Sequence, residues 1–425
     1  MTDTQTTTTP PDGDATSWAR NDLAGTVAAE PEADAKRRIA AAVADASDGI
    51  LELSHWIHAH PETAFEERGA AQRIADLLGR HGFAVEHPAG SLPTAIRATR
   101  RGGKAETDGR AGAAPRIAIL AEYDALPGLG HGCGHNTMAA SGVGAALALA
   151  ALADEIAGEI VFLGTPAEER GSGKAIMIED GLFAGIDAAL MFHPCDRNHV
   201  ESHPLASEDV DVVFHGEEAH ASSDPWRGRN ALDAMVLLFS SVGLWRQQLR
   251  PGLAVHGVIQ EGGTAANIIP ARTKAWFMIR SPRQDWYEEM KERFRALVDG
   301  AAVATNTRAE VTFSGGATTM KANGTLEARW VANAAAYGIA DQGPDPNSGS
   351  TDMGNVSWVC PTIHPELSIA PEGTPGHSIA FRDAAVSPTA DRTTLLAATL
   401  VAQSAWELFA DPELVAAAWR EFRAG

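Results

Sequence analysis

Residues 116–166 read RIAILAEYDALPGLGHGCGHNTMAASGVGAALALAALADEIAGEIVFLGTP, and this stretch decides the fold. Its two ends, 116–124 and 159–166, are short runs of small apolar and β-branched residues, which is the pattern of strands buried on both faces. Between them, residues 137–156 are rich in alanine and leucine and predict a buried helix with Asn136 as its N-cap. A strand, a helix and a second strand in this order indicate an α/β protein with a parallel sheet.

The alternation continues on both sides of this stretch, with helical patterns over 36–57 and 65–82 and an apolar strand over 188–194. We therefore expect a doubly wound, mostly parallel sheet covered by helices on both faces. Near residue 205 the pattern changes to alternating, half-exposed strands with two helices between them, which is typical of an antiparallel α+β sandwich. The sequence thus predicts a smaller domain over 206–320, inserted into a larger domain that comprises 36–205 and 321–425.

Composition excludes several classes of protein. The chain has 425 residues and a formal net charge of −21, so its surface repels nucleic acid and anionic lipid, and we expect neither as a partner. Residues 1–35 are rich in Thr, Pro, Asp and Ala, lack the pattern of a secretory signal, and predict a disordered tail. Three scattered cysteines do not form a disulfide framework, so a cytoplasmic location is expected.

Reactive side chains follow the predicted strands, and ligands of such sheets bind beyond the carboxyl ends of the strands. The glycines of residues 128–136, GLGHGCGHN, let a thiol and an imidazole face one point. Of two adjacent glutamates, one can bind a metal ion while the other takes a proton from a water molecule. Thiolate, imidazole and carboxylate together suit zinc, manganese or cobalt, and we interpret the set as a candidate metallohydrolase site. The residues concerned are Cys133, His135, Glu168, Glu169, His193 and the loop histidine His377.

Each feature alone also has an ordinary structural interpretation. A cysteine in a glycine-rich loop is often just a small buried residue, and adjacent glutamates usually lie in a solvated loop. We interpret His58 and His60 as structural and His131 as a residue that shapes its loop. Cys195 and Cys360 have no partner pattern and are expected to be buried and inert.

Seven motifs in order resemble one family over roughly residues 36–410. The chain is similar to the dinuclear metallopeptidases of clan MH, family 20, which include aminoacylases, carboxypeptidases and amidohydrolases. Within them it resembles the branch that contains p-aminobenzoyl-glutamate hydrolase and dipeptidase-like proteins. The motifs are AEYDALPGLGHGCGHN, GTPAEERGSGK, MFHP, GEEAHAS, GGTAANIIP, STDMGNVS and GHS.

The resemblance implies a site for two divalent metal ions, zinc or manganese with cobalt as a further candidate. It implies that Glu168 is the general base and that Asp124 orients a ligand. Many relatives have a metal-binding histidine at the position of Glu122, whereas the branch with a cysteine ligand has an acidic residue there. Glu122 is thus only a candidate extra ligand. The ligands that the resemblance implies are Cys133, His135, Glu169, His193 and His377.

The inserted domain resembles the family's lid and dimerisation domain, which implies a homodimer. There His220 matches a histidine that stabilises the oxyanion, in some relatives from the partner subunit, and Asn267 matches a residue that contacts substrate. Arg280 is a candidate for binding the substrate carboxylate. Ser350, Thr351 and Asp352 lie in a family-like loop without an assigned role.

The expected function is hydrolysis of a small-molecule amide: an N-acyl or aryl amino acid, or a dipeptide. Two alternatives stay open at this stage. Cys133 could be the nucleophile of a cysteine amidase, with His135 or His193 as its base. The chain could also be a relative that binds metal and ligand without catalysis.

Overall fold

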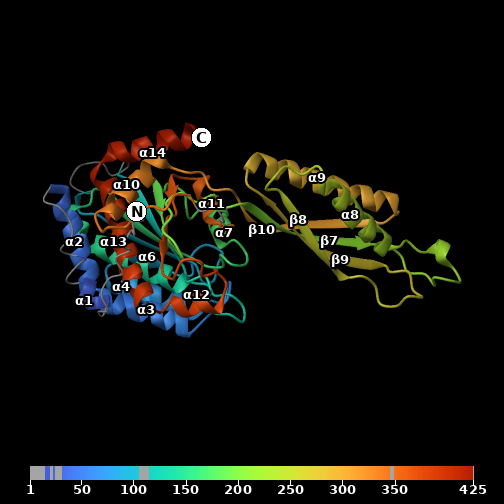
Figure 1. The fold of residues 1–425 in the computed structure, drawn as a ribbon, viewed down its shortest axis with the longest axis horizontal. Helices are drawn as coiled ribbons and strands as arrows, with labels where there is room; N and C mark the ends of the chain where they lie inside the picture. Colours follow the sequence, from blue (N-terminus) through green and yellow to red (C-terminus); the bar gives the residue numbers. More distant parts are fainter. Residues whose placement is uncertain (1–14, 20–22, 24–30, 105–113, 345–348, 425) are drawn as a thin grey trace, which may run out of the picture.

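The structure is a computed structural model and describes residues 15–19, 23, 31–104, 114–344 and 349–424. Two sheets form the cores of two bodies, one large and one small (Figure 1). The chain enters the small body at Ala206 and returns to the large body after Ala317, close to the expected limits of 206 and 320. The expected fold class, a mostly parallel α/β sheet with a separate antiparallel sheet, is confirmed.

The large body is built on a sheet of six strands in the order β1-β2-β4-β3-β5-β11. Strands β4, β3, β5 and β11 are mutually parallel, and β1 and β2 form an antiparallel edge. Glu122 at the end of β3 is in register with Thr165 at the end of β4, so both strands end at one edge. The strands are β1 (Ala84–Glu86), β2 (Ile96–Arg101), β3 (Arg116–Glu122), β4 (Glu159–Thr165), β5 (Ala188–Leu190) and β11 (Thr362–Ile363).

Helix α6 (His135–Ala151) lies at the centre of the large body, against β3 and β4 (Figure 1). It is apolar on all sides because helices α2, α3 and α13 cover it in turn. The helices of this body are α1 (Ala15–Trp18), α2 (Pro31–Asp45), α3 (Ser47–Ala59), α4 (Arg68–Arg80), α6, α7 (Gly173–Glu179), α10 (Gly324–Ala335), α11 (Met353–Ser357), α12 (Ile379–Ala384), α13 (Pro388–Ala410) and α14 (Pro412–Ala424).

The start of α6 differs from the expectation, because its N-cap is Gly134 rather than Asn136. Gly134 has φ +79°, and a Cβ there would lie 2.8 Å from Cγ of Pro194, so the position requires glycine. The Asn136 amide is already inside the helix and donates to Ser54 Oγ and to the Ala385 carbonyl, both at 2.9 Å. The side chain therefore joins three segments instead of capping one.

Most of the expected N-terminal tail lies outside the described residues. Where residues 1–35 are described, the structure differs from the expectation: α2 begins at Pro31, and Ala19 and Leu23 are buried in the core of the large body. The apolar residues of this segment thus contribute to packing. Among the described residues, no helix combines the length and the apolar content that a membrane span requires.

The small body is a four-stranded antiparallel sheet in the order β10-β7-β9-β8. Its strands are β7 (Ala206–His215), β8 (Ala254–Glu261), β9 (Arg272–Ser281) and β10 (Arg308–Ala317). Helices α8 (Ala231–Arg246) and α9 (Gln284–Ala304) cover one face, where Val210, Phe277 and Phe294 are buried. Alternation along the strands places Asp209, Met278 and Arg280 on the other face.

Candidate metal centre

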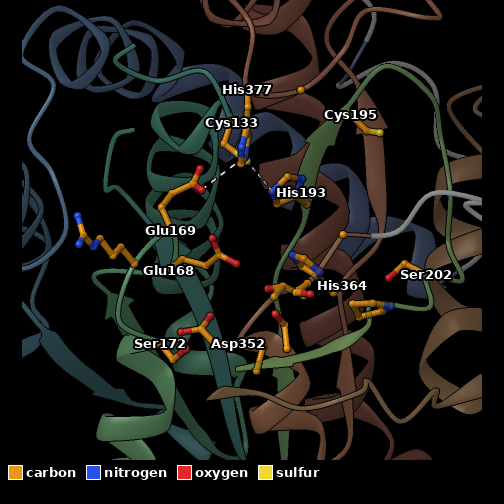
Figure 2. A pocket seen from close by; sticks show the side chains of 18 of the residues that line it. Cys133, Glu168, Glu169, Ser172, His193, Cys195, Ser202, Asp352, His364 and His377 are labelled. Carbon is orange, nitrogen blue, oxygen red and sulfur yellow. Dashed lines mark hydrogen bonds and ion pairs between the residues drawn. The ribbon is translucent and has the colours of Figure 1, made fainter. Parts of the chain in front are cut away.

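A cavity of about 560 Å³ lies where the two bodies meet, which is a size typical of small-molecule sites. From the large body it is lined by Cys133, Glu168, Glu169, His193 and His377, among others, and from the small body by Asp209, Met278 and Arg280. Figure 2 shows Cys133, Glu169, His193 and His377 gathered at one end, with Glu168 and His364 pointing into the cavity from opposite sides.

The carboxyl ends of the parallel strands bring these residues together, as the strand pattern predicts. Cys133 and His135 follow β3, and Glu168 and Glu169 follow β4. His193 begins the short strand β6 (His193–Cys195), which pairs in parallel with β12 (Glu366–Ser368). The loop after β12 carries His377, whose backbone N–H donates to the Gly132 carbonyl at 3.0 Å, so two loops distant in sequence are tied together.

Cys133 belongs to two groups of side chains that have metal-ligand geometry. One group is Cys133, His135 and His193, and the other is Cys133, Glu169 and His377, with the ligand atoms of each within 4.8 Å of one another. The Cys133 thiol lies 3.6 Å from His193 Nε2, and His377 Nε2 lies 3.4 Å from Glu169 Oε2. A single thiol shared by two groups is an arrangement that can hold two ions side by side.

Buried polar atoms without a hydrogen-bond partner mark the same place. His135 Nε2 and Glu169 Oε1 have none among the described residues, and the two atoms lie 4.0 Å apart. Glu122 Oε2, 3.1 Å from His135 Nε2, also forms no hydrogen bond with the described part of the chain, and Glu122, His135 and Glu168 form a third group with ligand geometry. Buried polar atoms are normally satisfied, so these donors fit bound metal ions.

Asp124 fixes the orientation of this cluster. One carboxylate oxygen accepts from His135 Nδ1 at 3.0 Å, and the other accepts from the Glu169 backbone N–H at 2.9 Å. Since Nδ1 carries the proton in this bond, Nε2 of His135 is left as a lone-pair donor toward the cluster. Asp124 thus joins the loop after β3 to the loop after β4.

Glu168 lines the cavity at the end of the loop that follows β4. Burial raises its pKa well above the usual range, and the nearby carboxylates of Glu122 and Glu169 raise it further. A carboxyl group held in this way exchanges a proton more readily near neutral pH than an exposed one does.

A buried ion cluster that the sequence does not reveal lies behind the site. The Lys174 ammonium is 2.5 Å from Glu122 Oε1 and 2.5 Å from Asp352 Oδ1, and all three side chains are almost wholly buried. The second Asp352 oxygen accepts from the Lys174 backbone N–H at 2.9 Å. This contact gives a structural place to Asp352, and it fixes Glu122 beside His135. A lone lysine in GSGK carries no signal of burial.

His364 is a second residue that the sequence analysis did not single out. It is 4 % exposed, lines the cavity, and its ring lies edge-on to His193 at 5.3 Å between centroids. Burial lowers its pKa well below the usual range. A signal did exist: TIHP follows the apolar strand β11 as MFHP follows the neighbouring strand β5.

The other histidines and cysteines lie apart from the ligand groups. His58 Nε2 is 2.9 Å from the Arg382 carbonyl, His60 Nδ1 is 2.7 Å from the Trp56 carbonyl, and both are in structural positions. His131 is buried with its ring 6.1 Å from that of His58. Cys360 is buried, whereas Cys195 is partly exposed and lines the cavity, so Cys195 is less enclosed than expected.

Two residues expected at the site do not reach it within one chain. His220 and Asn267 are exposed, lie close together in the small body, and are absent from the cavity lining among the described residues. The His220 ring nitrogen accepts from the Ser222 and Ser223 backbone N–H groups at 3.2 Å. Arg280, in contrast, lines the cavity, where its Nε lies 3.1 Å from Met278 Sδ.

Comparison with curated proteins identifies related enzymes. The chain is 36% identical over 405 residues to the Xaa-Arg dipeptidase of Mus musculus, an alignment that covers 91% of this chain and 92% of the relative. It is 32% identical over 297 residues to a p-aminobenzoyl-glutamate hydrolase of Escherichia coli, covering 65% of this chain and 60% of that protein.

Solved structures share the fold at lower identity. A dinuclear metal-binding peptidase of family M20 from Bacillus subtilis superposes with a TM-score of 0.61 at 21% identity, covering 84% of this chain and 98% of that one. An aminobenzoyl-glutamate utilization protein from Klebsiella pneumoniae gives 0.65 at 21% identity, covering 83% and 97%. The model of Peptidase family M20/M25/M40 matches residues 118–397, more than half of the chain. The chain belongs to this peptidase family and is a hydrolytic enzyme.

Proposed function

We propose that this protein is a two-metal amidohydrolase that cleaves the amide bond of a dipeptide or of an N-acyl or aryl amino acid. The observation that carries the proposal is the position of Cys133 in two ligand groups at once, one with His135 and His193 and the other with Glu169 and His377. The unpartnered, buried Nε2 of His135 and Oε1 of Glu169 support the same assignment.

The donor set restricts the metal. A shared thiolate, three imidazoles and one carboxylate suit zinc, manganese or cobalt better than magnesium or calcium. Ions bound there would polarise the substrate carbonyl and lower the pKa of a water molecule.

Glu168 then acts as the proton carrier. Its carboxylate removes a proton from the water molecule whose oxygen forms the new bond to the carbonyl carbon. The resulting carboxylic acid donates the proton to the amide nitrogen as the C–N bond breaks. Its raised pKa and its place in the cavity suit both steps. Asp124 keeps His135 and the backbone of Glu169 in position throughout.

The substrate carries a free carboxylate, which Arg280 binds. No ion pair engages the Arg280 guanidinium among the described residues, and the side chain faces the cavity from the small body. A bidentate pair between guanidinium and carboxylate fixes orientation as well as affinity. Dipeptides with a C-terminal arginine are the first substrates to test, because Xaa-Arg dipeptidase is similar along almost the whole chain.

The active form is a homodimer through the small body, in which His220 and Asn267 reach the cavity of the partner subunit. Both are exposed and remote from their own chain's ligand groups. The edge strand β8 and the exposed apolar residues Val236, Leu237 and Leu244 of α8 offer a surface for a second copy. The cysteines Cys133, Cys195 and Cys360 are free, which suits the reducing cytoplasm.

The deciding experiment measures metal content and hydrolysis together. Xaa-Arg dipeptides, p-aminobenzoyl-glutamate and N-acetyl amino acids are assayed with the purified enzyme before and after chelation and after re-addition of zinc or manganese. We expect turnover that depends on about two ions per chain. Turnover that survives complete chelation but is abolished by thiol alkylation would instead identify Cys133 as a nucleophile. Bound metal without hydrolysis of any of these amides would contradict the enzymatic assignment.

A further inference from the structure

The residue before Glu168 has an unusual backbone conformation. Ala167 is fully buried and has φ +61°, in the left-handed region that residues with a Cβ seldom adopt. Such a conformation persists only when the surroundings hold it in place. Because Ala167 and Glu168 are consecutive, the rotation about the Ala167 backbone sets the direction in which the Glu168 side chain leaves the end of β4.

A buried carboxylate holds this turn. The Ala167 backbone N–H donates to Glu67 Oε1 at 2.9 Å, across 100 residues of sequence. The other carboxylate oxygen of Glu67 accepts from Thr94 Oγ1 at 2.7 Å. Thr94 is fixed in turn, since its carbonyl accepts from the Tyr123 hydroxyl at 2.6 Å. Glu67 is thus attached through both oxygens to groups that do not move independently of the sheet.

Glu67 does not serve its own helix. It is the N-cap residue of α4, but its side chain makes no capping bond. Glu62 provides that function, because its two oxygens accept from the Gly69 and Ala70 backbone N–H groups, both at 2.9 Å. The Glu67 carboxylate is therefore directed away from α4 and toward the turn that precedes Glu168.

A charged side chain in this place is costly, and an apolar residue would fill the space without that cost. Glu67 has no solvent exposure, and burial raises its pKa to about 7. What the carboxylate supplies, and an apolar residue cannot, is a strong acceptor for the Ala167 N–H.

We infer that Glu67 is a positioning residue for the reaction: by holding the left-handed turn at Ala167, it keeps the Glu168 carboxylate directed into the cavity. This inference rests on the proposed role of Glu168 as proton carrier. Glu67 touches neither substrate nor metal ligand side chains, so its removal should affect the chemical step and leave binding intact.

The test uses three variants of the full-length enzyme loaded with metal. Glu67→Leu removes the acceptor, and we expect kcat to fall about tenfold with KM and metal content near their original values. Glu67→Gln keeps an oxygen facing the Ala167 N–H and should retain most of the kcat. Glu62→Ala is the matched control: it removes the cap of α4 and lowers the melting temperature, but it should leave kcat unchanged.

A double-mutant cycle separates positioning from general disruption. If Glu67 acts through Glu168, then Glu67→Leu costs little further rate once Glu168 has been replaced by Gln. An equal fold-loss in both backgrounds, or a loss of metal in Glu67→Leu alone, would overturn the inference. Failure of the proposed function is distinguishable, because Glu168→Gln would then itself leave kcat unchanged.

A milder variant covers the case in which Glu67→Leu does not fold. Thr94→Val leaves Glu67 in place but removes the bond to its second oxygen. A fall in kcat of about two- to fivefold at constant metal content supports the inference, again only when Glu168 is present. An unchanged kcat together with an unchanged KM in Thr94→Val contradicts it.

Discussion

The Lys174 ammonium lies 2.5 Å from a carboxylate oxygen of Glu122, and neither side chain has any solvent exposure. Burial lowers the pKa of Lys174, but the carboxylates of Asp352 and Glu122 outweigh this effect and raise it. The lysine is therefore charged in the interior, where it neutralises two acids behind the ligand groups.

Lys174→Met should lower the free energy of unfolding by about 3–5 kcal/mol, because it leaves two buried carboxylates without a counter-charge. Urea unfolding measures the effect. The matched control is Lys274→Met, since Lys274 pairs with Asp211 at 3.0 Å on the surface, where the cost should stay within about 1 kcal/mol. Equal losses in the two variants would contradict the importance of burial.

Cys133→Ala should remove both metal ions, because the thiol belongs to both ligand groups. Metal analysis of the purified variant measures this directly. Cys195→Ala is the control, since Cys195 lines the same cavity but belongs to neither group. Retention of two ions in Cys133→Ala would show that the thiol has a structural role only.

Glu168→Gln should lower kcat by about 100-fold or more, the range expected for a positioned base, while the metal content stays near that of the original enzyme. Glu169→Gln should instead lose metal, because its carboxylate belongs to a ligand group. The reverse pattern would show that the two glutamates have exchanged roles. Steady-state kinetics and metal analysis on both variants decide between these results.

The sequence predicts well what depends on local pattern. The runs of apolar residues over 116–124 and 159–166 correspond to β3 and β4, and the side chains that follow them meet at one edge of the sheet. Parallel strands make this convergence a consequence of topology, so no distance is needed to foresee it. The grouping of Cys133 with Glu169 and His377 follows the same logic.

Contacts between distant, individually ordinary residues are not readable in this way. Lys174 and Asp352 are 178 residues apart, and lysine is usually exposed, so nothing marks their buried pairing. Glu67 lies in a charged helix start, EERG, that is typical of a solvated surface. The position of His220, remote from its own ligand groups, depends on how the two bodies are placed and not on the motif around it.

Arg280→Met should raise KM about tenfold for substrates with a free carboxylate and leave kcat nearly unchanged, since the lost bond is the same in the bound substrate and in the transition state. For the corresponding carboxamide substrate, KM should not respond to the substitution. Arg272→Met on the same strand is the control, because Arg272 is exposed and pairs with Glu261 outside the cavity. A KM increase of equal size for both substrates would place the carboxylate site elsewhere.

Glu327→Gln tests a pH effect that is independent of the site. Burial, and secondarily the nearby Glu201 carboxylate, raises the pKa of Glu327 to about 7 from an ordinary value of 4.5. A carboxyl whose pKa is higher in the folded than in the unfolded state stabilises the fold below pH 4.5, and this contribution is lost as the pH rises to 7. Because the side chain is only half-buried, solvent screening reduces the effect to about 1–2 kcal/mol.

The Glu327→Gln variant has no charge to bury, so its stability relative to the original enzyme should increase by about 1–2 kcal/mol between pH 4.5 and pH 7.5. Urea unfolding at intervals across this range gives the difference at each pH. Glu413→Gln is the control, because Glu413 is a largely exposed partner of Arg420 on the surface of α14, and its difference curve should be flat. A flat curve for Glu327→Gln as well would show that Glu327 ionises in the fold as readily as in the unfolded chain.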